Sequence, residues 1–96
     1  MRSLRRQHRD DSNRDQLHSF WTGLPGTSWV DLMPTEKGMP DALLGCWRKD
    51  QLVEIKVDGK WPTEAQEEWA ARWQGRPVIT IRKTSELQQL YLEMRG

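Results

Sequence analysis

One continuous stretch constrains the fold most, because it reads as a strand, a helix and a second strand in succession. Gln51–Val57 alternates its side chains between two faces, as a strand does. Helical periodicity runs from Thr63 to about Gln74, and the β-branched run Pro77–Ile81 predicts a short strand. Two strands joined through a helix in this way lie parallel, with a right-handed crossover. The sequence therefore predicts a β-α-β unit.

The helix of this unit has sequence signals at both ends. Thr63 and Gln66 have the spacing of a capping box, and Gly75 is placed to end the helix in the left-handed conformation. Trp69 and Trp73 lie on one apolar stripe, with Gln66 on the same side. We expect this stripe to pack inward, with both tryptophans serving the core.

The remaining segments predict two strands and a helix before this unit and one helix after it. The expected elements are a helix at Asn13–Trp21, strands at Thr27–Leu32 and Ala42–Trp47, and a closing helix at Ser85–Met94. The polar turn Arg48–Asp50 joins the second strand to the third as a hairpin. The predicted order is α-β-β-β-α-β-α, and the predicted class is α/β with a mixed α+β sheet.

Size and composition limit the possible classes of protein. A chain of 96 residues forms one domain with a modest core. No apolar stretch approaches the roughly 20 residues of a membrane span, and the basic start is not followed by a secretory apolar run. The single Cys46 cannot form an internal disulfide, so we expect a reducing, cytoplasmic setting, which is the host cytoplasm if a phage encodes the chain.

Net charge gives no argument for a nucleic-acid partner, since 15 basic residues nearly balance 14 acidic ones. The distribution of charge is more informative, because arginines crowd the first positions, Arg5, Arg6 and Arg9 among them. They can neutralise phosphates, although a solvated arm is the alternative. We therefore separate a basic arm, residues 1–10, from a folded domain, residues 11–96.

The predicted hairpin gathers two acidic residues and a lysine. Glu54 and Lys56 share one strand face, and a turn centred near Lys49 puts Asp41 opposite Lys56 and diagonally from Glu54. Paired carboxylates are hard oxygen ligands suited to Mg²⁺, and a lysine can stabilise charge on a phosphoryl group. The alternative is ordinary charge decoration, in which a cross-strand pair contributes only roughly 0.2–1 kcal/mol.

Three motifs, "GMPDALLG", "LVEIKVDGKWPTEAQEEW" and "GRPVITI", together resemble the PD-(D/E)XK nuclease superfamily. The chain looks most like small stand-alone VRR-NUC proteins and Holliday-junction-resolvase-like nucleases of phages, from about Asp11 to Glu93. The resemblance implies a restriction-endonuclease-like α-β-β-β-α-β core with a C-terminal helix, so that residues 11–96 form the nuclease domain. Gly38 fits the family's Gly-x-Pro-Asp form.

The resemblance also implies a role for each residue of the site. Asp41 and Glu54 bind the metal together with the main-chain carbonyl of Ile55, and Lys56 assists the attacking water. Gln66 falls on the family's glutamine of the next helix, where completing the capping box is its alternative role. The implied cofactor is Mg²⁺, for which Mn²⁺ can substitute.

The first helix departs from the family pattern. Many members carry a metal-binding glutamate there, whereas this chain has Asn13, with Asp11 and Asp15 nearby. An asparagine keeps an oxygen ligand without the charge, so metal affinity is lower or a second metal is absent. A simple N-cap role for Asn13 or Ser12 is the alternative.

These features together predict a Mg²⁺-dependent endodeoxyribonuclease, a homodimer that cuts Holliday junctions or flaps in phage recombination or replication. The expected DNA contacts are Arg5, Arg6, Arg9 and Lys60. A catalytically weak DNA-binding or assembly module that keeps the fold is the alternative. A restriction enzyme is disfavoured, because 96 residues leave little room for a base-reading domain.

Three of the six tryptophans lie at strand or loop positions where a role outside the core is also possible. Trp29, Trp47 and Trp61 can each stack on a nucleobase, be buried at a dimer contact, or fill the core. Trp21 is expected in the core.

Overall fold

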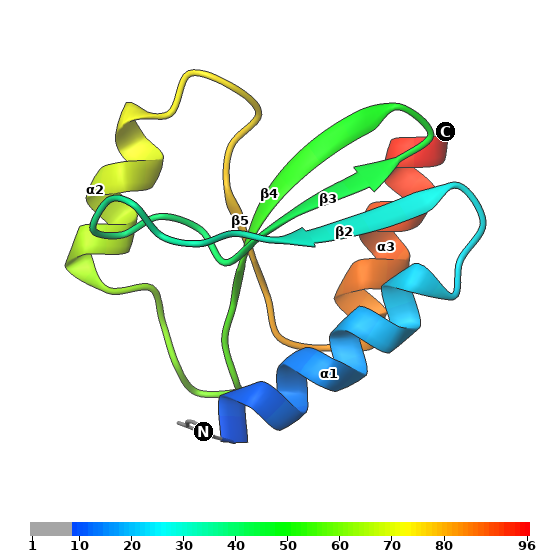
Figure 1. The fold of residues 1–96 in the computed structure, drawn as a ribbon, viewed down its shortest axis with the longest axis horizontal. Coiled ribbons are helices and arrows are strands. Elements are labelled where there is room, and N and C mark those ends of the chain that lie inside the picture. Colours follow the sequence, from blue (N-terminus) through cyan, green and yellow to red (C-terminus); the bar gives the residue numbers. More distant parts are fainter. Residues whose placement is uncertain (1–8) are drawn as a thin grey trace.

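The computed structural model describes residues 9–96, which follow the predicted order of elements (Figure 1). The elements are α1 (Arg9–Thr22), β2 (Thr27–Asp31), β3 (Ala42–Cys46), β4 (Lys49–Ile55), α2 (Glu64–Arg72), β5 (Ile79–Ile81) and α3 (Thr84–Arg95). The predicted α/β class with a mixed sheet is confirmed. Within this range no helix is both long and apolar enough to cross a membrane.

The four strands form one sheet in the order β2-β3-β4-β5. Neighbours from β2 to β4 pair antiparallel, whereas β4 and β5 pair parallel. α2 lies in the connection between the two parallel strands, so the predicted β-α-β unit is present (Figure 1). As an inner strand, β4 buries every residue from Gln51 to Ile55.

The core lies on one face of the sheet, where α1 and α3 pack (Figure 1). The helices contribute Leu17, Trp21, Leu87, Leu90, Tyr91 and Met94, and the strands contribute Ala42, Leu44, Cys46, Val53, Ile55 and Ile81. Full burial of one large apolar side chain contributes about 1.5–3 kcal/mol. Trp21 is in this core as predicted, and its indole N–H donates to the carbonyl of Ser28 at 2.9 Å.

The turn between β3 and β4 differs from the prediction. Its composition favours a turn at Arg48–Asp50, but Cys46 pairs with Lys49, so only two residues connect the strands. These residues, Trp47 and Arg48, both have positive φ, 51° and 71°, as a two-residue hairpin of the primed type requires. Because residues other than glycine rarely adopt such φ, the sequence carries no signal for this turn.

α2 begins as predicted and ends differently. Thr63 and Gln66 form the capping box through both of its hydrogen bonds. The helix ends at Arg72, where Trp73 is extended (φ −73°, ψ 129°), and Gly75 does not have positive φ. The predicted left-handed ending at Gly75 is therefore wrong. The indole of Trp73 lies against this glycine, with Nε1 2.6 Å from where a Cβ would stand, so the glycine makes room for the ring.

α2 has no buried residue, so the predicted packing of Trp69 and Trp73 into the core is also wrong. Their rings stack on each other, with centroids 5.2 Å apart, and Trp69 Nε1 donates to Glu36 Oε1 at 2.8 Å. Gly38 (φ 86°) approaches the helix so closely that a Cβ there would stand 2.2 Å from the Ala65 carbonyl oxygen. The loop before β3 thus holds the helix through main-chain and polar contacts rather than through burial.

Candidate active site

Glu54 is a buried carboxyl in the middle of the sheet. It lies on β4 between β3 and β5, pairs with Thr80, and is only 3% exposed. A carboxyl in such a place requires hydrogen-bond donors, a proton or a cation, because burying an unpaired charge is costly. Gln66 on α2 supplies one donor, with its Nε2 3.0 Å from Glu54 Oε1.

Gln66 makes both of the contacts considered for it. Its Oε1 accepts from the Thr63 N–H at 2.8 Å, which completes the capping box, while its Nε2 donates to Glu54. The capping contact determines which end of the amide faces Glu54, because only the nitrogen can donate. The start of α2 therefore orients the hydrogen-bond donor of the buried carboxyl.

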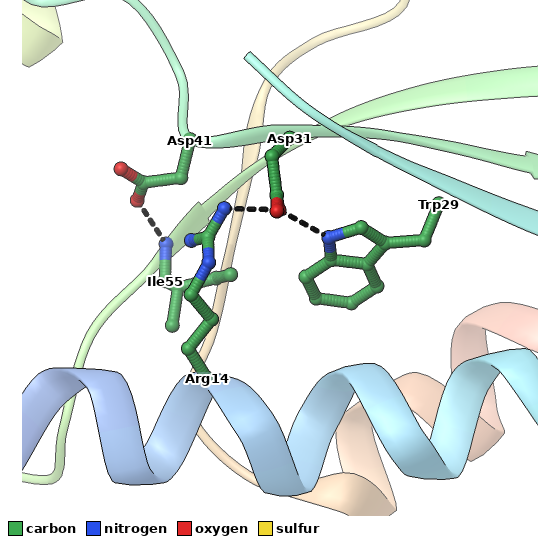
Figure 2. A network of polar contacts seen from close by, with 5 residues as sticks. All are labelled: Arg14, Trp29, Asp31, Asp41 and Ile55. Carbon is green, nitrogen blue, oxygen red and sulfur yellow. Dashed lines mark hydrogen bonds and ion pairs between the residues drawn. The ribbon is translucent and has the colours of Figure 1, made fainter. Parts of the chain in front are cut away.

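Asp41 lies just before β3, where the chain makes a bulge. Its N–H donates to the Val53 carbonyl at 3.0 Å, although the ladder pairs Val53 with Ala42. Two residues therefore oppose one, which is the arrangement of a β-bulge. The Asp41 Oδ2 atom accepts a hydrogen bond from the Ile55 N–H at 2.7 Å (Figure 2). The bulge thus directs this carboxylate to the end of β4.

The carboxyls of Asp41 and Glu54 are in contact. The predicted register, with Asp41 opposite Lys56, is wrong, because the shorter turn moves Asp41 along β4 toward Glu54. Burial, then the Asp41 charge and a hydrogen bond with it, raise the pKa of Glu54 from 4.5 to about 8, whereas the Lys56 charge lowers it. Without a cation, the pair therefore holds a proton at neutral pH.

Lys56 is held through its main chain from two sides. Its N–H donates to the Ile81 carbonyl at 3.1 Å, and its carbonyl accepts from Asn13 Nδ2 at 3.1 Å. α1 begins at Arg9, so Asn13 and Ser12 lie inside the helix, and the N-cap alternative for both is wrong. Asn13 thus links α1 to the end of β4. Because its Nδ2 donates to Lys56, only Oδ1 of its side chain can contact a metal ion.

A second polar network, which the sequence analysis missed, lies near the carboxyl pair. Arg14 on α1 forms an ion pair with Asp31 at the end of β2, and Asp31 Oδ1 also accepts from Trp29 Nε1 at 2.7 Å. Figure 2 shows the guanidinium pointing from α1 toward the end of the sheet that carries Asp41 and Ile55. Arg14 and Asp31 are 17 positions apart in the sequence, so no local pattern could have indicated their pairing.

A cavity of about 480 Å³ opens beside Glu54, between α2 and β5. Glu54 and Gln66 line it together with Ala70 and Thr80, among others. Although Glu54 is almost fully buried, the cavity therefore gives a ligand access to its carboxyl from this side.

The carboxyl pair suits a hard divalent cation. Mg²⁺ is bound through one or two carboxylates and keeps several of its waters. Asp41 and Glu54 provide the carboxylates, and the main chain of Ile55 lies against Asp41. Among the described residues, no three or more histidine, cysteine, aspartate or glutamate side chains cluster as a metal site. The protein ligands that the structure brings together are thus the carboxylates of Asp41 and Glu54.

The predicted DNA contacts are placed only in part. Arg5 and Arg6 lie outside the described residues, as does the side chain of Arg9. Lys60 is exposed in the loop between β4 and α2, where its carbonyl accepts from Arg82 Nη2 at 2.6 Å. Lys60 is thus four positions beyond Lys56, in the loop that leads from β4 to α2.

No protein-family model matches the chain, and searches of curated proteins and of solved structures give no match either.

Proposed function

We propose that this chain is a Mg²⁺-dependent endodeoxyribonuclease of the PD-(D/E)XK type, with a restriction-endonuclease-like core. The observation that carries the proposal is the contact between Asp41 and Glu54, next to Lys56, with Glu54 only 3% exposed. Simple charge decoration of a hairpin leaves carboxyls solvated and apart, and it gives no reason for burying one acid in contact with another.

Asp41, Glu54 and the main-chain carbonyl of Ile55 would hold the ion. When bound, Mg²⁺ lowers the pKa of a water ligand and stabilises negative charge on the phosphoryl group. Ile55 N–H orients the Asp41 carboxylate, and Gln66 orients that of Glu54. Both carboxylates are thus fixed before substrate binds, which is what electrostatic preorganisation requires.

Lys56 supplies the positive charge of the site. In the proposed reaction it orients the attacking water and stabilises the pentacovalent transition state. Asn13 and Ile81 fix its main chain from the two sides. Its proximity to the carboxyl pair is reflected in the lowering effect of its charge on the pKa of Glu54.

Branched DNA and a homodimer belong to the same proposal. A four-way junction has two-fold symmetry, and opposed cuts in it need two active sites, which a C₂ dimer supplies. The flap alternative needs one site. In either case we propose phage recombination or replication as the setting, with host cytoplasm as the location.

The test is a cleavage assay with labelled junction, flap, duplex and single-stranded DNA of matched sequence. We expect cutting in Mg²⁺ or Mn²⁺, none in EDTA, and a preference for the branched substrates. Light scattering on the same samples gives the oligomeric state. Tight DNA binding with no cutting in either metal would refute the enzyme and favour the binding or assembly module.

Lys56→Met is expected to lower the cleavage rate by about 10²–10³-fold, the loss seen when one preorganised charge or donor is removed. Mg²⁺ binding, measured by calorimetry, should persist, because the carboxylate ligands remain. Lys49→Met, an exposed lysine at the other end of β4, is the matched control and should cut normally. Equal rates for both variants would remove Lys56 from the mechanism.

A further inference from the structure

The loop between β4 and α2 displays an aromatic ring to solvent. Trp61 is 76% exposed, the most exposed of the six tryptophans. By comparison, Trp21 fills the core, Trp29 is hydrogen-bonded to Asp31, and Trp47 is half-exposed. Trp61 is therefore the tryptophan whose ring surface contributes least to folding.

An arginine is fixed against this ring. The Cζ atom of Arg82 lies 4.8 Å from the centroid of the Trp61 ring, which is a cation–π contact. Arg82 is itself restrained. Its side-chain Nη2 donates to the Lys60 carbonyl at 2.6 Å, and its main-chain N–H donates to Glu86 Oε1 at 2.5 Å. The ring and the guanidinium thus form one unit, here called the Trp61–Arg82 platform.

The platform lies at the same edge of the sheet as the carboxyl pair. β4 and β5 are parallel, so their C-terminal ends meet at one edge. Lys56 directly follows β4 and Arg82 directly follows β5, and the Lys56 N–H donates to the carbonyl of Ile81, the residue before Arg82. Adjacent strands are about 4.8 Å apart, so the platform starts within one strand spacing of Lys56.

We propose that the Trp61–Arg82 platform stacks an unpaired nucleobase of the strand whose phosphodiester lies at Asp41 and Glu54. An exposed aromatic ring can stack on any base, which contributes about 1–3 kcal/mol, and the cations of Arg82 and Lys60 can contact the flanking phosphates. Bases inside an intact duplex already stack on their neighbours. The platform therefore selects DNA with single-stranded nucleotides beside the cleavage point, and this inference rests on the proposed function.

The experiment measures binding apart from cleavage. Labelled single-stranded and duplex oligonucleotides of matched length are titrated with the full chain in EDTA, and affinity is read by fluorescence anisotropy. We expect Trp61→Ala to weaken single-strand binding about tenfold, as loss of one stacked base implies, with little change for duplex. Trp61→Phe should recover most of the loss, because it restores a ring.

The control is Trp47→Ala, which removes a half-exposed tryptophan from the turn at the opposite end of β4. It should bind both oligonucleotides as the wild type does. The platform is refuted if Trp61→Ala leaves single-strand binding unchanged or weakens duplex binding equally. It is also refuted if the substitution dissociates a dimer in light scattering, which would make Trp61 a subunit contact.

The two proposals can fail separately. A Trp61 effect on binding without any cleavage by wild type in Mg²⁺ would retain the platform and reject the nuclease. Cleavage by wild type together with normal single-strand binding by Trp61→Ala would retain the nuclease and reject the platform.

Discussion

Replacing Asp41 by asparagine is expected to lower Mg²⁺-dependent cleavage by about a thousandfold or more, because metal-ion catalysis contributes several kcal/mol to the transition state. The substitution conserves shape but removes one of the two carboxylates that would bind the ion. Single-turnover cleavage of a junction or flap, at saturating Mg²⁺, measures the effect. DNA binding in EDTA should persist or tighten slightly, since one negative charge near the phosphate is removed.

The matched control for this variant is Asp50→Asn, which neutralises an exposed aspartate at the other end of β4. It should cut at the wild-type rate. If Asp41→Asn and wild type cleave equally well, the assignment of the metal site is wrong, whatever DNA the protein prefers.

Glu54→Gln is expected to abolish cleavage to a similar extent while making the metal-free protein more stable at alkaline pH. The folded protein keeps the Glu54 proton up to about pH 8, whereas the unfolded chain loses it near 4.5. Between these values unfolding releases a proton, so the unfolding free energy of wild type falls as pH rises, by at most about 1.4 kcal/mol per unit. The neutral glutamine removes this dependence and stabilises the folded state by a few kcal/mol above pH 8.

Urea unfolding in EDTA across this pH range measures the effect. Glu68→Gln changes an exposed carboxyl on α2 and should keep the pH dependence of wild type. Mg²⁺ should stabilise wild type and not Glu54→Gln, since a bound ion replaces the proton. A Glu54→Gln curve parallel to that of wild type would show that Glu54 is ionised in the folded protein.

The fold could be predicted largely because its elements carry local signals. Period-two alternation marks β4, the Thr63 capping box marks the start of α2, and the i, i+3, i+4 pattern of α3 places its buried face. The predictions that failed concern a helix end and a turn, whose backbone conformations the local sequence does not indicate. α2 ends at Arg72, with Trp73 extended and packed against Gly75. Trp47 and Arg48 adopt a turn conformation that their side chains do not favour.

The candidate site shows the same division. The sequence motifs named Asp41, Glu54, Lys56 and Gln66, and the structure brings the first two into contact and links Gln66 to Glu54. The contact between Asp41 and Glu54 could not be predicted from the sequence. It depends on the register of β3 and β4 and on the bulge at Asp41, and neither has a local sequence signal. The contact of Asn13 with Lys56 and the pairing of Arg14 with Asp31 also connect residues far apart in the chain.

The two faces of β4 separate the protein's folding from its chemistry. Val53 and Ile55 point into the core beneath α1 and α3, whereas Glu54 points to the opposite face, toward a helix that buries no residue. Side chains on α2 and its flanking loops can therefore be exchanged with little loss of core packing. A scaffold arranged in this way is evolvable, because it can change what it binds through one face while the other preserves its foldability.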